Sequence, residues 1–102
     1  MFNKKFKIIV KDFLKKDYSH NPEDGEKIVK EIKEKNIENK DVELDFKDMK
    51  TVNTAFCNVI YEALKNRKEK YNVTLIHCNS FILETFERVR DNYDKKVNTN
   101  DL

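Results

Sequence analysis

Hydrophobic residues along this chain change their spacing repeatedly, and this pattern restricts the fold more than any other feature. Apolar residues alternate with polar ones, as in half-buried strands, in the segments 6–10, 42–46 and 71–78. Helical spacing follows each of these, in the segments 22–35, 54–64 and 82–93. The order strand, helix, strand, helix, strand, helix predicts an α/β domain with right-handed crossovers.

The first two strands also carry charge on every second residue, as in Glu43, Asp45 and Lys47. A parallel sheet covered on both faces would instead consist of continuous apolar runs. We therefore expect a small mixed or mostly parallel sheet with helices packed mainly on one face. Residues 1–95 form this single domain, and residues 96–102 form a polar C-terminal tail.

Residues that begin helices or form turns stand between these segments. Asn21 is suited to cap the first helix, Asn53 or Thr54 the second, and Asn79 or Ser80 the third, because a short polar side chain accepts hydrogen bonds from the first helical N–H groups. Residues 12–14 extend or bend the first strand, and residues 15–20 form a loop.

Composition excludes several classes of protein. The 21 Lys and Arg residues and 19 Asp and Glu residues nearly cancel, and 38% of the 102 residues are apolar, unlike a disordered chain. No apolar run reaches the ~18 residues that a membrane span needs, and the N-terminal apolar stretch is too short for a signal peptide. A single glycine leaves no phosphate-binding loop, and no nucleotide fingerprint is present. We expect a cytoplasmic protein without enzymatic activity or cofactor.

Residues that could bind metal or react are few. Cys57 and Cys78 belong to no C-x-x-C motif, and His20 and His77 have no partner at metal-ligand spacing. We expect reduced thiols and no metal site. Asp45 is conceivable as a catalytic carboxylate, but the alternation favours a position on the wet face or a bond to a neighbouring loop.

The N-terminal strand has a basic edge formed by Lys4, Lys5, Lys7 and Lys11. Lysines can neutralise nucleic-acid phosphates, but they also protect exposed sheet edges from aggregation. The net charge of only +2 favours the protected edge over nucleic-acid binding. The same lysines argue against pairing of this edge with a second copy, and the oligomeric state stays open.

Residues 42–56, VELDFKDMKTVNTAF, resemble the STAS-like domain family, in which a strand ending in Asp-Phe leads through a short loop to a helix that begins with Ser/Thr-Phe. The strand at 71–78, Asn79 and the following helix are also similar to this family, and the region of Gly25 resembles its first helix more loosely. The resemblance extends from residue 5 to residue 95 and implies a STAS-like α/β fold.

This resemblance also implies a function. Related STAS domains include bacterial anti-sigma factor antagonists, in which a Ser or Thr at this helix start is phosphorylated by a partner kinase of the GHKL ATPase type. By position that residue is Thr54, preceded by Asn53 where the antagonists have Asp. The resemblance implies a non-enzymatic regulatory module, with a partner-binding surface composed of Asp48, Asn53, Thr54, Phe56 and Asn58.

Two alternatives remain at this stage. Thr54 can be a helix cap without regulatory role. The protein can also be a small phage or mobile-element product that binds a host defence component and inhibits or triggers it.

Overall fold

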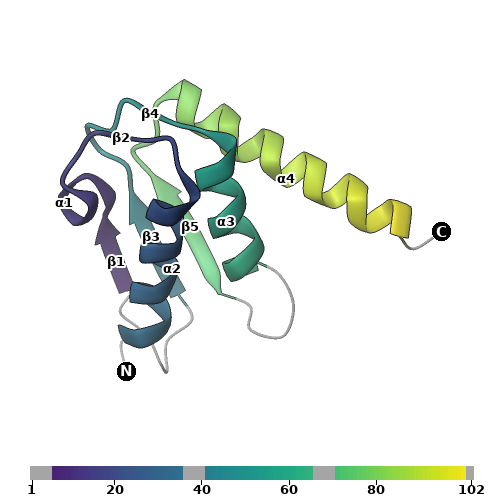
Figure 1. Cartoon of the computed structure of the whole chain (residues 1–102), viewed down its shortest axis with the longest axis horizontal. Coiled ribbons are helices and arrows are strands. Elements are labelled where there is room, and N and C mark those ends of the chain that lie inside the picture. The colour runs from purple at the N-terminus through teal and green to yellow at the C-terminus, as the bar shows by residue number, and fades with distance from the viewer. Residues whose placement is uncertain (1–5, 36–40, 66–70, 101–102) are drawn as a thin grey trace.

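The computed structural model describes residues 6–35, 41–65 and 71–100 (Figure 1). In chain order its elements are β1 (Phe6–Ile9), α1 (Val10–Leu14), β2 (Tyr18–Ser19), α2 (Pro22–Lys35), β3 (Asp41–Asp45), β4 (Thr51–Val52), α3 (Thr54–Lys65), β5 (Asn72–Ile76) and α4 (Ser80–Asn100).

Three strands form the main sheet, in the order β1-β3-β5, and both pairs are parallel. Ile8 is in register with Leu44, and Leu44 is in register with Leu75. The short strands β2 and β4 form a second, two-stranded parallel sheet, which lies beyond the carboxyl ends of β1, β3 and β5 (Figure 1). The prediction of a mostly parallel α/β domain is confirmed.

The two faces of the main sheet differ in polarity. Ile8 and Leu44 are buried on one face, where α2 and α3 cover the strands (Figure 1). On the opposite face the next residues in register are Lys7, Glu43 and Thr74, and Lys7 Nζ lies 3.7 Å from a Glu43 carboxylate oxygen. The predicted packing of helices on one face is confirmed, and the hydrophobic effect explains it because only one face is apolar.

Aromatic rings fill the centre of the core. Phe46, directly after β3, contacts Phe56 of α3 and Phe86 of α4 in edge-to-face arrangements, with ring centroids 6.5 and 5.6 Å away. Gly25 of α2 allows the close approach of α3, because a Cβ atom at Gly25 would lie 3.0 Å from the Phe56 carbonyl oxygen.

Several boundaries differ from the sequence-based prediction. Residues 10–14 form the short helix α1 instead of extending the first strand, and Lys15 ends that helix in the left-handed conformation (φ 62°). The segments predicted as connections contain β2 and β4, whose two-residue length gives no periodicity to detect. The last helix continues to Asn100, through most of the expected tail. Among the described helices none is both long and apolar enough to cross a membrane.

Candidate functional site

The three longer helices begin with the same local device, an asparagine cap. The side-chain oxygen of Asn21 accepts a hydrogen bond from Asp24 N (2.9 Å), that of Asn53 from Phe56 N (3.0 Å), and that of Asn79 from Ile82 N (2.8 Å). Such caps satisfy N–H groups that the helix itself leaves without partners. The predicted cap at Asn21 is confirmed, and of the two candidates for α4, Asn79 and Ser80, the structure selects Asn79.

Two of these asparagines also connect their helix to a loop from elsewhere in the chain. The Asn53 side-chain amide donates to the His20 carbonyl (2.9 Å). The Asn79 amide donates to the carbonyls of Met49 (3.2 Å) and Lys50 (3.0 Å). The Asn53 and Asn79 side chains therefore hold the starts of α3 and α4 in position. Both the oxygen and the amide group of each side chain make hydrogen bonds within the protein.

Thr54 is the first residue of α3 and is exposed. The interpretation of Thr54 as the cap is wrong, because Asn53 makes that hydrogen bond. Across the described residues, the Thr54 hydroxyl has no hydrogen-bond partner in the protein. Its side chain is thus available to solvent at the start of a twelve-residue helix.

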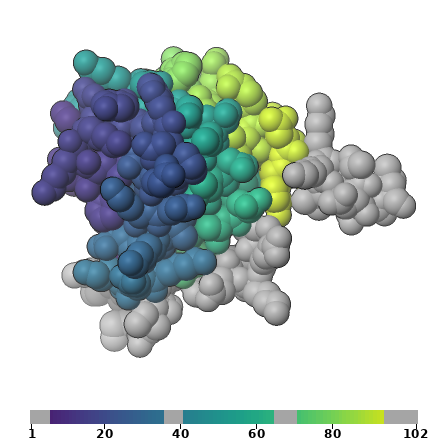
Figure 2. Space-filling model, in the orientation of Figure 1, coloured from purple at the N-terminus to yellow at the C-terminus, as the bar shows by residue number. Residues whose placement is uncertain are grey.

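A surface groove lies beside Thr54, between α3 and α4. The groove has a volume of about 410 Å³ and is lined by Thr54, Ala55, Asn58, Glu62, Val89, Asn92 and Tyr93. We call it the α3–α4 groove. Thr54, Asn58 and Glu62 are spaced by four residues and therefore share one face of α3. The space-filling view shows α3 and α4 adjacent on one side of the molecule (Figure 2).

The other residues predicted for partner binding are in different surroundings. Phe56 is fully buried in the core, so its predicted contact with a partner is wrong: an apolar ring next to the helix start packs inward. Asp48 is exposed in a turn with φ 64°, outside the lining of the α3–α4 groove. Of the predicted surface, Thr54 and Asn58 remain together in this groove.

Sequence reasoning missed the contribution of α4 to this groove. Glu62 could have been found from its spacing to Asn58, which is one helical turn. Asn92 and Tyr93 could not, because their position beside α3 depends on how α4 packs. The Tyr93 ring contacts the ring of Tyr61 on α3, with centroids 5.4 Å apart.

A second polar cluster lies at the carboxyl ends of β3 and β5. Asp45 is buried, and its Oδ1 accepts a hydrogen bond from Lys47 N (2.9 Å) and lies 2.8 Å from His77 Nδ1. Lys7 Nζ lies 3.5 Å from Asp45 Oδ2. The predicted bond of Asp45 to a neighbouring loop is confirmed. Burial opposes ionisation of Asp45, but these hydrogen bonds and charges outweigh it and lower its pKa.

No activated nucleophile accompanies this aspartate–histidine pair among the described residues. Burial, followed by the charge of Asp45, raises the pKa of the neighbouring Cys78 thiol to about 11. Burial and the nearby Cys78 raise the pKa of the Cys57 thiol. Both thiols are therefore protonated near pH 7, and a protonated thiol is a poor nucleophile.

A second buried carboxylate, Asp24, which sequence reasoning also missed, connects β2 to α2. Asp24 accepts a hydrogen bond from the Ser19 hydroxyl (2.7 Å) and forms an ion pair with Lys16, whose Nζ lies 2.6 Å from Asp24 Oδ2. Burial again opposes ionisation, but the bonds from Lys16 and Ser19, with the Lys16 and Lys27 charges, lower the Asp24 pKa. Asp24 itself is buried, and its bonds fasten the start of α2 to β2 and the preceding turn, which indicates a structural role.

These two carboxylates predict a loss of stability in acid. A lowered pKa means that the folded protein binds the proton less tightly than the unfolded chain. The contribution of Asp24 and Asp45 is therefore complete above their ordinary pKa of 3.8 and is lost as the pH falls through the lower folded-state values. Urea denaturation between pH 7 and pH 2 should show this decline. Asp45→Asn should flatten it, whereas the exposed-residue control Asp48→Asn should leave it unchanged; equal curves for wild type and Asp45→Asn would contradict this prediction.

The basic edge is only partly described. Lys4 and Lys5 lie outside the described residues, Lys7 pairs with Glu43 and Asp45 on the sheet, and Lys11 is exposed on α1. The carboxylates beside Lys7 reduce its attraction for phosphate. Within the described part of the chain, no group of three His, Cys, Asp or Glu side chains is arranged to hold a metal ion.

The parallel sheet and its one-sided helical layer define a small α/β domain, an architecture consistent with a STAS-like fold. The family model described as a STAS-like domain of unknown function (DUF4325) matches residues 24–80, more than half of the chain, and the chain belongs to this family. The matched segment runs from the buried Asp24 to the start of α4 and includes Thr54. No curated protein and no solved structure matches the chain.

Because Asn53 caps α3 and the Thr54 hydroxyl does not, we expect substitutions at the two positions to differ in their effect on stability. Asn53→Ala should lower the free energy of unfolding by about 1–2 kcal/mol, because it removes the helix cap and the bond to His20. Thr54→Ala should change it by less than about 0.5 kcal/mol, because the exposed hydroxyl stabilises nothing in the fold. Urea denaturation of both variants measures this difference, and a larger effect at Thr54 would show that its hydroxyl does act as the cap.

Proposed function

We propose that this protein is a non-enzymatic regulatory module that binds a protein partner and is switched by phosphorylation of Thr54. The observation that carries the proposal is the exposed, uncommitted hydroxyl of Thr54 at the first position of α3, where Asn53 already supplies the cap. A kinase can modify this hydroxyl without breaking a hydrogen bond of the fold.

The surroundings of Thr54 suit a phosphate electrostatically. The first turn of α3 contains no acidic residue. The N-terminus of a helix favours negative charge, through its dipole and its unpaired N–H groups. A phosphate at Thr54 is therefore tolerated by the folded domain.

The same modification would change the α3–α4 groove strongly. Among the described side chains that line the groove, Glu62 alone carries a formal charge; the polar residues Asn58, Asn92 and Tyr93 are neutral. A phosphate adds about −1.5 to −2 charges at pH 7. A partner bound to the nearly neutral groove would meet a strongly negative one, which changes its affinity.

The partner class follows from the family resemblance and the form of the groove. A half-open, mixed polar and apolar surface between two helices suits a protein segment. The resemblance to anti-sigma factor antagonists points to an ATPase of the GHKL type as kinase and partner, acting in the cytoplasm. The module itself acts by binding.

Phosphate transfer tests this proposal directly. The protein is incubated with radiolabelled ATP and each GHKL-type kinase encoded in the same genome, and the modified residue is mapped by mass spectrometry. We expect label on Thr54, its loss in Thr54→Ala, and its retention in Ser80→Ala. Ser80 is the matched control, because it is an exposed hydroxyl at the first position of α4 behind an asparagine cap.

Label that persists in Thr54→Ala, or the absence of label with all of these kinases, would overturn the switch. Complex formation provides the second measurement. The glutamate in Thr54→Glu mimics part of the phosphate charge, and we expect it to change the partner's dissociation constant at least tenfold, whereas Ser80→Glu should leave it unchanged.

A further inference from the structure

The two edge strands of the main sheet, β1 and β5, differ in whether they carry charged residues that would prevent a strand of another chain from pairing with them. The edge strand β1 carries the charged Lys7, whose ammonium group lies beside Glu43 and Asp45 of β3. A lysine on an edge strand discourages another strand from adding there. The five residues of β5, Asn-Val-Thr-Leu-Ile, contain no charge and no proline. Within the described residues, β5 has a strand on one side only, so its outer edge is open.

The backbone of β5 presents defined groups to this open edge. The Ile76 carbonyl accepts a hydrogen bond from Phe46 N (2.9 Å), so Ile76 directs its backbone groups toward β3. The direction alternates along a strand, so Val73 and Leu75 direct their N–H and C=O groups outward. No hydrogen bond of these groups to other parts of the described chain is present.

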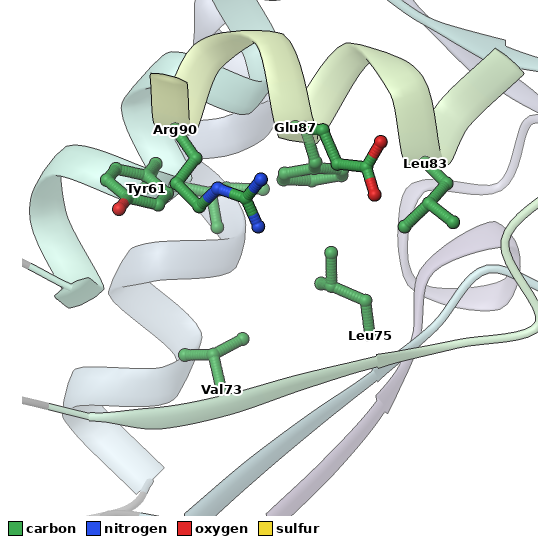
Figure 3. A pocket seen from close by; sticks show the side chains of 8 residues that line it. Tyr61, Val73, Leu75, Leu83, Glu87 and Arg90 are labelled. Carbon is green, nitrogen blue, oxygen red and sulfur yellow. The ribbon is translucent and has the colours of Figure 1, made fainter. Parts of the chain in front are cut away.

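A mainly apolar pocket lies beside the same edge, on the helical side of the sheet, and Glu87 and Arg90 of α4 also line it. Val73 and Leu75 reach from β5 toward α4, where Leu83 lies on the opposite wall (Figure 3). Phe86 also lines the pocket. The pocket has a volume of about 190 Å³, and Leu83 is 43% exposed. A strand that added to β5 would cover this exposed apolar surface as well as bond the outward backbone groups.

We propose that this edge is a homodimer interface in which β5 pairs antiparallel with β5 of a second copy about a two-fold axis at Thr74. In this register the outward groups of Val73 bond those of Leu75 of the partner subunit, and the reverse pair forms by symmetry. The side chains of Val73 and the partner subunit's Leu75 lie opposite each other at the mouth of the pocket. Thr74 faces its symmetry mate on the other side of the sheet.

A second copy is the favoured occupant because β5 is complementary to itself. Its lack of charge means that antiparallel pairing brings no like charges together, and opposed threonines form a favourable cross-strand pair. The dimer also closes: the combined sheet then ends at β1 on both sides, where each copy presents Lys7. The assembly stops at two subunits instead of growing into a fibre.

Solution mass measured with a matched pair of lysine variants tests this interface. Thr74 is exposed and in register with Glu43, so Thr74→Lys is accommodated in the monomer but places two lysines together at the two-fold axis. Ile9→Lys is the control, because Ile9 is 41% exposed on the same face but belongs to β1. By sedimentation at high micromolar concentration we expect dimers for wild type and Ile9→Lys, and a monomer for Thr74→Lys.

A covalent probe tests the register. Opposed residues of a pair that is not hydrogen-bonded have Cα atoms about 4.5 Å apart, within the range that a disulfide spans. With Cys78→Ser in the background, Thr74→Cys should form an intermolecular disulfide under mild oxidation, and Ile9→Cys should not. Amide hydrogen exchange at Val73 and Leu75 should slow as the protein concentration rises.

Three results would overturn the proposal. A wild-type protein that stays monomeric at high micromolar concentration excludes the dimer and leaves the edge to a strand of another protein. A Thr74→Lys variant that remains dimeric places the interface elsewhere. Equal cross-linking at positions 74 and 9 refutes the register. None of these measurements depends on Thr54, so they test the interface separately from the phosphorylation switch.

Discussion

Replacing Phe46 with alanine is expected to lower the free energy of unfolding by about 3–5 kcal/mol, the cost of removing a fully buried phenylalanine ring. The Phe46 ring contacts Phe56 and Phe86, so its loss leaves a cavity among β3, α3 and α4. Its backbone is also fixed, because Phe46 N donates to Ile76 O and Phe46 O accepts from Met49 N. The surrounding chain therefore has little freedom to close the cavity.

Urea denaturation followed by circular dichroism measures this effect. Phe81→Ala is the control, because Phe81 is 51% exposed at the start of α4 and its removal opens no cavity. We expect the control to change the free energy of unfolding by less than about 0.5 kcal/mol. Similar losses for the two variants would show that Phe46 does not have the central packing role assigned to it.

Gly25→Val is expected to destabilise the protein by about 2–3 kcal/mol through overpacking of the α2–α3 contact. The new Cβ would lie 3.0 Å from the Phe56 carbonyl oxygen and 3.1 Å from Val59 Cβ. A backbone oxygen inside a helix cannot rotate away, so α2 and α3 must separate. Because Phe56 lies two residues after Thr54, this separation would also displace the start of α3.

Gly25→Ala tests the same contact with a smaller side chain, which adds only the Cβ atom. Alanine gains about 1 kcal/mol of helix propensity over glycine, and this offsets part of the steric cost. We therefore expect Gly25→Ala to be less destabilising than Gly25→Val. Glu26→Val is the control on the exposed neighbouring position, with an expected loss below about 1 kcal/mol. If Gly25→Val and Glu26→Val have equal effects, the contact with α3 does not require glycine.

The main elements could be predicted from local pattern because each depends on nearby residues. Alternating residues specify which face of a strand is buried, and short polar side chains specify where a helix begins. Asn21 was a predictable cap for this reason, and Asn79 was one of two candidates together with Ser80. The choice between Asn53 and Thr54 was not predictable, because both residue types can cap, and only the position of His20 selects Asn53 by accepting its amide hydrogen bond.

The candidate site was predictable on one helix only. Thr54 and Asn58 are close in sequence, and their four-residue spacing places them on one face of α3. Phe56, between them, was wrongly assigned to the surface, although its four-residue spacing to the buried Ile60 and Leu64 places it on the apolar face of α3. Asn92 and Tyr93 depend on the packing of α4 beside α3, which no local pattern records.

By itself, the sequence determined the α/β class, the polar face of the sheet and the likeness to STAS-like domains, because these follow from periodicity and from one contiguous motif. Only the tertiary structure decided which polar groups remain unused. It assigns the cap of α3 to Asn53 and exposes Thr54, and it buries Asp24 beside Lys16 and Asp45 beside Lys7. Within the described residues it also leaves β5 at an open edge of the sheet. The physical reason is that burial and pairing depend on residues far apart in the chain, whose approach is determined by packing of the whole core.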